Sequence, residues 1–315
     1  MDEQFGERVH ESPQAGAEPR IEDRADALES PVRFQFDLAE MEVQWDSVDE
    51  TLWSFMTPSG RPSFNPAMLR DLTAWQTEIR NLFAAGSHPI KYIVLGSRYP
   101  GVFNLGGDLD YVANRIEQKD QLGLEAYGNH CVDILYRNFI ALDLPVVTIA
   151  LIQGDAVGGG FESALSFNVL IAERGSTFSL PENLFGMFPG VGAHSFLTRR
   201  LNVAQAEKLM LSGRNYSAEE MHELGLVHVL AEPGQGEAAV RDYIRQNGKR
   251  QNGQHGVYRA SREVNPITLE ELRRVVRVWA ETAMRLTPHH LKVMRRLAGM
   301  QARAAVAVAP VDATA

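Results

Sequence analysis

The feature that most constrains the fold of this chain is an apolar run at residues 144–152 (LPVVTIALI), which leads into a glycine-rich turn. A membrane helix needs about 20 apolar residues, so this run predicts a buried strand. Three consecutive glycines, Gly158 to Gly160, then open a helix that we expect at residues 161–167. A strand that passes through such a turn into a helix is typical of α/β proteins with parallel strands.

The same order recurs along the chain, which makes α/β the predicted fold class. Buried strands are expected at residues 91–96, 169–172 and 177–180, and residues 66–84 have the apolar spacing of an amphipathic helix. From residue 204 onward the pattern is almost entirely helical. The sequence therefore predicts a parallel sheet followed by a helical C-terminal part.

Other segments carry weaker local signals. Residues 33–38 and 41–45 alternate apolar and polar side chains, which predicts a hairpin or a bent strand pair. Residues 52–62 contain two prolines and a glycine and are interpreted as a loop. We expect the long helical stretch after residue 108 to be interrupted near Gly123 and Gly128.

Charge is distributed unevenly. Residues 1–31 hold nine acids, three bases and almost no large apolar side chains, which predicts a disordered acidic tail. Residues 241–315 hold 14 bases and six acids, although the whole chain has a net charge of −9. This basic segment either meets an anionic partner or forms solvated helix faces. The acidic total, with no basic run interleaved with aromatic residues, disfavours nucleic-acid binding.

The cellular compartment is predicted from two observations. The N-terminus has no apolar stretch of the kind that a secretory signal requires. The single cysteine, Cys131, can form neither an internal disulfide nor a cysteine-based zinc site, and we expect it to be a small buried hydrophobe. A cytoplasmic protein without a membrane span is therefore expected.

Two glutamates follow expected strands. Glu162 lies in the first turn of the helix after the glycine triplet, and Glu182 follows Pro181. Neighbouring parallel strands share one rim at their carboxyl ends, where α/β proteins bind ligands. Two carboxyls in one apolar cleft can act as acid and base. The alternatives are a helix-dipole partner for Glu162 and a loop charge for Glu182.

The glycine-rich turns supply a second chemical element. Consecutive glycines at a helix start leave backbone N–H groups unhindered, and Gly106 and Gly107 can act in the same way from the earlier loop. Two converging N–H groups form an oxyanion hole, which stabilises an enolate-like or tetrahedral transition state. The alternative for the triplet is a tight packing turn between strand and helix.

Several other chemistries lack support. The glycine triplet is not followed by the Lys-Ser/Thr of a P-loop, no Gly-x-Gly-x-x-Gly follows a strand, and no Gly-x-Ser-x-Gly occurs. His289 and His290 are adjacent and so do not share one helix face. No metal centre is predicted.

Three sequence segments occur in a characteristic order: residues 103–109 (FNLGGDL), 154–162 (GDAVGGGFE) and 180–182 (LPE). In this order they resemble the crotonase (enoyl-CoA hydratase/isomerase) superfamily, and the resemblance extends over about residues 34–304. Four longer phrases are residues 102–109 (VFNLGGDL), 158–166 (GGGFESALS), 184–193 (LFGMFPGVGA) and 279–284 (WAETAM). These phrases resemble the diffusible-signal-factor synthases, a crotonase subfamily of bacterial quorum sensing.

The resemblance implies a crotonase-like spiral of ββα units at residues 32–230. A C-terminal helical region at residues 231–304 would serve trimerisation, giving a homotrimer or a dimer of trimers, and residues 305–315 would form a frayed tail. By position, Gly107 and Gly159 match the two oxyanion-hole donors of the family. Glu162 and Glu182 match the two catalytic glutamates of the hydratases.

The synthase resemblance implies a dehydratase that also has thioesterase activity. Such an enzyme converts a 3-hydroxyacyl group on acyl carrier protein to the cis-2-enoyl thioester and releases a cis-2-enoic fatty acid. It needs no cofactor apart from the carrier- or CoA-linked substrate. Acyl carrier protein is acidic, so basic residues are the hypothetical docking site. These are Lys249, Arg250, Arg259 and Arg262, or Arg199 and Arg200.

Two functions other than the synthase stay open. One alternative is an enoyl-CoA hydratase or isomerase of fatty-acid degradation. The other is a non-catalytic regulator that binds a sensor kinase, a partner that the synthase resemblance also implies.

The acyl chain of the substrate requires an apolar channel. The candidate channel residues are Leu184, Phe185, Met187, Phe188, Trp279, Met284 and Leu297. For each of them the alternative is an ordinary place in the hydrophobic core.

Overall fold

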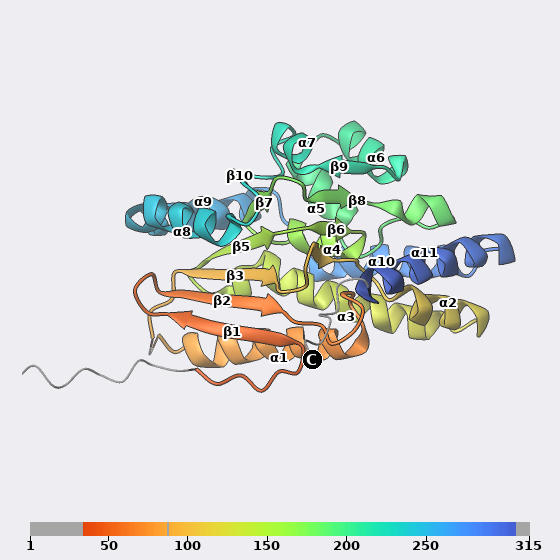
Figure 1. Cartoon of the computed structure of the whole chain (residues 1–315), viewed down its shortest axis with the longest axis horizontal. Helices are drawn as coiled ribbons and strands as arrows, with labels where there is room; N and C mark the ends of the chain where they lie inside the picture. The colour runs from red at the N-terminus through yellow and green to blue at the C-terminus, as the bar shows by residue number, and fades with distance from the viewer. Residues whose placement is uncertain (1–33, 87, 307–315) are drawn as a thin grey trace, which may run out of the picture. The chain divides into compact units, whose positions relative to one another are not determined.

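A computed structural model describes residues 34–86 and 88–306 of the chain, with side chains up to Met300 (Figure 1). The predicted tail at residues 1–31 lies outside the described residues, as does the predicted frayed tail except for residues 305 and 306. The predicted boundary between core and C-terminal helices at residues 230 and 231 stays a prediction.

The larger sheet has six strands in the order β1–β2–β3–β5–β7–β10, with β1 antiparallel to β2 and the other neighbours parallel. Alternate residues of its central strands enter two separate cores, so both faces of the sheet are buried. Its strands are β1 (Met41–Asp46), β2 (Thr51–Met56), β3 (Tyr92–Ser97), β5 (Val147–Ile152), β7 (Val169–Glu173) and β10 (Val229–Ala231).

The prediction for residues 52–62 was wrong in its first half, because β2 occupies Thr51–Met56. Every residue of β2 is buried between two neighbouring strands, so the strand lacks the alternation that marks a half-buried strand. The predicted partner of the hairpin was also wrong. Residues 34–38 form no strand, and β1 pairs with β2 instead.

The smaller sheet has four strands in the order β4–β6–β8–β9. Three successive strand pairs, β3–β4, β5–β6 and β7–β8, each give their first strand to the larger sheet and their second to the smaller one, and each pair is followed by a helix or helical turn. This arrangement confirms the expected spiral of ββα units. Its strands are β4 (Val102–Asn104), β6 (Asp155–Val157), β8 (Thr177–Ser179) and β9 (Asn215–Ser217).

The predicted helix at residues 66–84 is confirmed as α1 (Pro66–Phe83), capped by Asn65. The expected interruption is displaced: α2 (Leu109–Glu117) and α3 (Gln121–Phe139) are separated near Lys119, which has a positive φ of 56°. Gly128 lies within α3, where a Cβ atom would overlap Val276. This glycine therefore permits close helix packing and does not end a helix.

The remaining helices surround the sheets, with α10 against α3 and α11 against both α2 and the turn η3 (Figure 1). None of the helices in the described residues is long and apolar enough to cross a membrane. The elements are η2 (Ala141–Asp143), α4 (Gly159–Leu165), η3 (Pro181–Phe185), α5 (Ala193–Arg200), α6 (Val203–Ser212), α7 (Ala218–Glu223), α8 (Gly236–Asn247), η4 (Gly248–Arg250), α9 (Gln251–Val264), α10 (Leu269–Ala283) and α11 (Pro288–Val306).

Candidate active site

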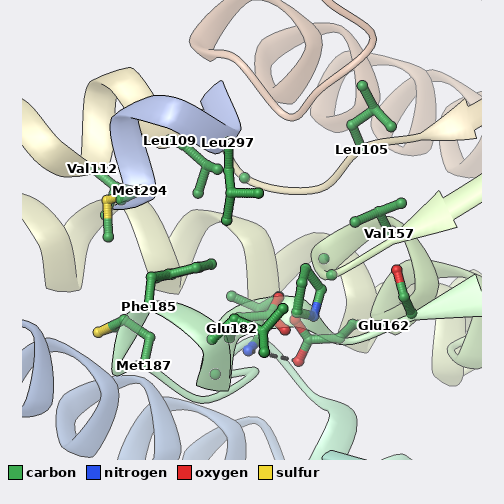
Figure 2. A pocket seen from close by; sticks show the side chains of 18 of the residues that line it. Leu105, Leu109, Val112, Val157, Glu162, Glu182, Phe185, Met187, Met294 and Leu297 are labelled. Carbon is green, nitrogen blue, oxygen red and sulfur yellow. Dashed lines mark hydrogen bonds between the residues drawn. The ribbon is translucent and has the colours of Figure 1, made fainter. Parts of the chain in front are cut away.

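A pocket of about 320 Å³ lies where β4, β6 and β8 end, and both predicted glutamates line it (Figure 2). Its walls are mostly apolar, and no lysine, arginine or histidine is among its described lining residues. A cleft with this composition favours neutral carboxyl groups, because it offers no cation to offset a second negative charge.

Glu162 lies in the first turn of α4 with only 1% of the residue exposed. Its Oε1 atom accepts hydrogen bonds from the backbone N–H groups of Val191 at 2.9 Å and Ala193 at 2.8 Å. Burial raises the pKa of Glu162 to about 7, against the lowering effect of these backbone donors. The donors hold the carboxylate in one orientation and favour its ionised form.

Glu182 approaches from η3, and its Oε2 atom is buried without a hydrogen-bond partner in the described part of the chain. Burial, followed by the negative charge of Glu162, raises the pKa of Glu182 to about 8. The two carboxyls therefore interact, and at neutral pH the pair retains at least one proton. The unsatisfied oxygen is free to bond to a substrate.

Gly158 makes room for the second carboxyl. Its φ is 52°, and a Cβ atom there would overlap the Oε1 atom of Glu182. The Gly158 N–H also donates to the carbonyl of Ser179 at 2.8 Å, which links the start of α4 to the end of β8. The first glycine of the triplet therefore has a steric role that is specific to this site.

Gly107 and Gly159 line the same pocket. A Cβ atom at Gly159 would lie 3.5 Å from the nitrogen of Gly107, so the start of α4 and the loop after β4 are in direct contact. Among the hydrogen bonds of the described residues, neither N–H group has a protein acceptor. Two neighbouring N–H groups that have no protein acceptor in the described part of the chain are the kind of donors that an oxyanion hole requires.

Most of the residues predicted for an acyl channel line this pocket, and their role in binding an acyl chain stays a prediction. Leu184, Phe185, Met187, Trp279 and Leu297 all line the pocket. Gly190 accommodates the indole of Trp279, because a Cβ atom at Gly190 would overlap that ring.

Two predicted channel residues lie elsewhere. Phe188 lines a separate cavity with Val275 and Val278, because it follows Met187 and the backbone directs adjacent side chains apart. Met284 follows the last turn of α10 and packs against the core without lining the pocket. Both are apolar residues near the site whose direction depends on the tertiary backbone path.

Sequence reasoning missed much of the opposite wall. Leu109 and Val112 come from α2 and Met294 from α11, and Figure 2 shows them across the pocket from η3. Leu109 and Val112 are three residues apart, as are Met294 and Leu297, and this spacing is typical of one face of a helix. The spacing predicts a buried face, but it does not distinguish a pocket wall from the hydrophobic core. The other missed residues are Phe64, Leu105, Tyr127 and Val157.

Cys131 is confirmed as buried, with 2% of the residue exposed, and it also lines the pocket. Burial raises the pKa of its thiol to about 12, so the thiol stays protonated at neutral pH. Cys131 is therefore part of the apolar wall.

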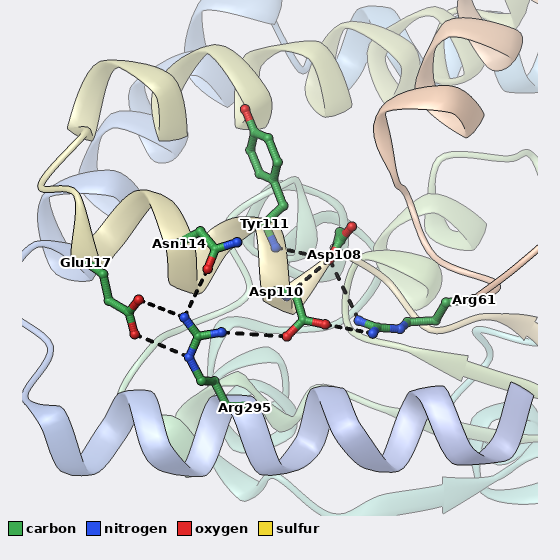
Figure 3. A network of polar contacts seen from close by, with 7 residues as sticks. All are labelled: Arg61, Asp108, Asp110, Tyr111, Asn114, Glu117 and Arg295. Carbon is green, nitrogen blue, oxygen red and sulfur yellow. Dashed lines mark hydrogen bonds and ion pairs between the residues drawn. The ribbon is translucent and has the colours of Figure 1, made fainter.

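A polar network joins α11 to the opposite wall (Figure 3). Arg295 pairs with Glu117 at 2.7 Å, donates to Asn114 at 3.0 Å and lies 3.9 Å from Asp110. Asp110 also pairs with Arg61 at 2.7 Å. These contacts connect the outer face of α11 to α2, while the inner faces of both helices line the pocket.

None of the predicted carrier-docking residues lines the pocket that contains the two glutamates. Gln251, at the start of α9, donates to the carbonyls of Lys91 and Pro145, which precede β3 and β5. The start of α9 is thus attached at the N-terminal ends of β3 and β5, whereas the pocket lies at the C-terminal ends of β4, β6 and β8. Arg199 pairs with Glu271. Arg200 donates to the carbonyl of Leu165, which ends α4, and to the carbonyl of Phe167, two residues later.

This spiral, with two carboxyls and two free glycine N–H groups in one pocket, defines a protein of the crotonase class. More specifically, the chain belongs to the enoyl-CoA hydratase/isomerase family, whose model matches residues 55–252. The human mitochondrial enoyl-CoA hydratase domain-containing protein 2 is 31% identical over 185 residues, which are 58% of this chain and 59% of that protein.

A second relative is similar in sequence, and a solved structure is similar in fold. The mitochondrial methylglutaconyl-CoA hydratase of Rattus norvegicus is 33% identical over 154 residues, which are 48% of this chain and 46% of the relative. The chain thus spans about half the length of the curated relatives it matches. The crystal structure of an enoyl-CoA hydratase from Bacillus halodurans shares the fold, with a TM-score of 0.67, 22% identity, and coverage of 82% of this chain and 100% of the other.

Proposed function

We propose that this protein is a diffusible-signal-factor synthase. It dehydrates 3-hydroxyacyl groups on acyl carrier protein to the cis-2-enoyl thioester and hydrolyses that thioester to a free cis-2-enoic fatty acid. The observation that carries the proposal is the placement of Glu162 and Glu182 in one apolar pocket with the N–H groups of Gly107 and Gly159. The synthase-like phrases at residues 102–109 and 184–193 select this reaction within the family.

The two carboxyls have different hydrogen-bonding environments. Glu162 accepts two backbone N–H bonds, which favour the carboxylate, whereas the Oε2 atom of Glu182 has no partner in the described residues. In the resting pair, Glu162 is therefore the main site of negative charge and Glu182 holds the proton.

The dehydration step uses this arrangement directly. The Glu162 carboxylate removes a proton from C2, and the electron pair moves toward the thioester carbonyl, whose oxygen the glycine N–H groups stabilise. Glu182 then protonates the hydroxyl group on C3, which leaves as water while the C2–C3 double bond forms. At the end of the step Glu162 carries the proton and Glu182 is ionised.

The hydrolysis step can reuse the same groups. The Glu182 carboxylate takes a proton from a water molecule while the oxygen of that water attacks the thioester carbonyl carbon. The N–H groups of Gly107 and Gly159 stabilise the tetrahedral oxyanion that forms. The C–S bond breaks, and the departing thiolate takes a proton from Glu162. The site returns to its resting protonation state.

A second candidate function is the reversible hydration of trans-2-enoyl-CoA in fatty-acid degradation. The family match and the hydratase names of the relatives favour it. The same two carboxyls would add water in place of removing it. A third possibility is a regulator that holds a sensor kinase and needs no turnover.

The assembly and the compartment are further parts of the proposal. We expect a homotrimer or a dimer of trimers that uses the C-terminal helices, in the cytoplasm. The groove that contains Phe188, Leu211 and Val278 supports a contact between copies, since Leu211 and Val278 are apolar residues that are 63% and 52% exposed. Light scattering on the purified chain measures the number of copies.

A product assay tests the proposed function. The purified chain is incubated with 3-hydroxydodecanoyl-acyl carrier protein and, separately, with the CoA ester, and the products are identified by mass spectrometry and NMR. The variants Glu162→Gln and Glu182→Gln are run beside Glu223→Gln, a control at an exposed glutamate on α7. We expect free cis-2-enoic acid from the carrier-linked substrate, lost in both site variants and kept in the control.

The other outcomes separate the alternatives. Reversible trans hydration of the CoA ester without free acid assigns the protein to fatty-acid degradation. No turnover of either substrate favours the regulator. In that case, signalling that survives the double Glu162→Gln/Glu182→Gln substitution contradicts any catalytic role.

A further inference from the structure

A side-chain hydroxyl completes the backbone pairing beside Gly107. Phe64 and Gly107 form an isolated parallel bridge, in which the Phe64 N–H donates to the Gly106 carbonyl at 2.7 Å. In an ordinary parallel ladder, the next N–H along the chain would donate to the Phe64 carbonyl. Here the Tyr127 hydroxyl stands between them. It accepts from the Asp108 N–H at 3.0 Å and donates to the Phe64 carbonyl at 2.8 Å.

This pairing sets the direction of the Gly107 N–H. The N–H belongs to the peptide unit whose carbonyl is that of Gly106, and the two groups point in opposite directions because a trans peptide is planar. Once Phe64 binds the Gly106 carbonyl, the Gly107 N–H is directed the other way. Tyr127 holds the Phe64 carbonyl on one side and the Asp108 N–H on the other.

Tyr127 is itself firmly placed. It extends from α3, is only 7% exposed, and its ring packs against Tyr111 with the centroids 5.0 Å apart. Its hydroxyl lies 3.4 Å from the position of a Cβ atom on Gly107. Burial raises the pKa of this phenol well above its ordinary value, so its proton stays available to Phe64 across the working pH range.

We propose that Tyr127 is a positioning residue of the oxyanion hole, whose hydroxyl acts on the reaction by orienting the Gly107 N–H. This inference rests on the proposed function of the site. The hydroxyl is not assigned to proton transfer, because its proton is already donated to the Phe64 carbonyl. Its removal would leave the pocket walls in place and release the peptide that binds the substrate carbonyl.

The main test measures carbonyl polarisation without turnover. Dodecanoyl-CoA labelled with carbon-13 at C1 is bound to the Glu162→Gln/Glu182→Gln variant, with and without Tyr127→Phe, and the carbonyl stretch is followed by isotope-edited infrared spectroscopy. We expect the stretch to shift to lower frequency on binding. Tyr127→Phe should abolish most of that shift while the dissociation constant stays nearly constant.

Kinetics with the glutamates intact supply a second readout. Removing an oxyanion donor lowers kcat by about 10²–10³, and loosening one should cost less, so we expect Tyr127→Phe to lower kcat by about 10-fold or more with little change in KM. Tyr243→Phe is the matched control. It removes a hydroxyl that is hydrogen-bonded to Gln254 on the α8–α9 side of the molecule, and it should change neither the spectrum nor kcat.

Each outcome decides the proposal. An unchanged carbonyl stretch in folded Tyr127→Phe overturns it, as does an equal effect of Tyr243→Phe. If Tyr127→Phe does not fold, 3-fluorotyrosine is placed at position 127, which makes the hydroxyl a stronger hydrogen-bond donor. An unchanged carbonyl stretch in that protein also overturns the proposal. Wild-type protein that polarises the carbonyl but forms no product contradicts the proposed function and leaves the positioning role standing.

Discussion

The carboxyl group of Glu182 occupies the space that a side chain at Gly158 would fill. Gly158 also has a φ of 52°, which disfavours other residues. Two separate constraints, one on the backbone and one on volume, therefore meet at the first glycine of the triplet.

Gly158→Ala separates these constraints when it is compared with Gly225→Ala. Gly225 has a φ of 76° but nothing within 4 Å of its Cβ position. Both variants should lose about 1–2 kcal/mol of unfolding free energy from backbone strain. Only Gly158→Ala should also displace Glu182 and lower kcat strongly, measured in the product assay. Equal activity of the two variants would contradict the steric role of Gly158.

The raised pKa of Glu182 predicts that stability depends on pH. The ordinary value of 4.5 applies to the unfolded chain and a value of about 8 to the folded one. Between these limits the folded state keeps a proton that the unfolded state releases, so the unfolding free energy falls as the pH rises and levels off above pH 8.

Glu182→Gln removes this dependence, because an amide does not titrate. We expect urea denaturation to show that the unfolding free energy of Glu182→Gln rises by about 3–4 kcal/mol relative to the wild-type value on going from pH 5 to pH 8, because each pH unit in this range contributes up to about 1.36 kcal/mol. The variant should also lose activity. Glu223→Gln is the control and should follow the wild-type curve. A constant difference between Glu182→Gln and the wild type at all pH values would refute the buried neutral carboxyl.

Arg295 should influence substrate binding more than stability. Its partners Glu117 and Asp110 are about half exposed, so loss of the ion pairs costs about 1 kcal/mol or less. Because α11 carries Met294 and Leu297 of the pocket wall, we expect Arg295→Met to raise KM for a dodecanoyl substrate several-fold with kcat nearly unchanged.

Arg274→Met is the control for that experiment. Arg274 forms an exposed pair with Glu270 four residues earlier on α10 and does not line the pocket. Steady-state kinetics of the two variants should therefore differ in KM while their melting temperatures stay similar. A KM effect of the same size in both variants would show that surface charge, and not the attachment of α11, determines binding.

Cys131 should limit the length of the acyl chain. Cys131→Leu adds volume to the buried wall, and each methylene group that no longer fits costs about 0.8 kcal/mol, or roughly fourfold in kcat/KM. We expect dodecanoyl substrates to lose more activity than hexanoyl substrates, whereas Cys131→Ala should keep the wild-type order. Comparing kcat/KM across chain lengths checks this, and a uniform loss would indicate simple overpacking.

The sequence by itself determined the local units and the residues at their ends. The apolar run before β5, the glycine triplet and the spacing of Glu162 and Glu182 all act over a few residues, so they were readable without tertiary contacts. The hydrogen-bonded capping box at Ser217 is another local signal. In contrast, β2 was missed because burial on both faces removed the alternation that identifies a strand.

Only the tertiary structure decided what surrounds the glutamates. Tyr127 reaches Phe64 across 63 residues, and α11 supplies a wall to a pocket whose second glutamate lies more than 100 residues earlier. Phe188 and Met284 are as apolar as the true lining residues but point elsewhere. Apolar side chains carry no information about which cavity they face, because burial is non-directional, and only the packed backbone assigns them a direction.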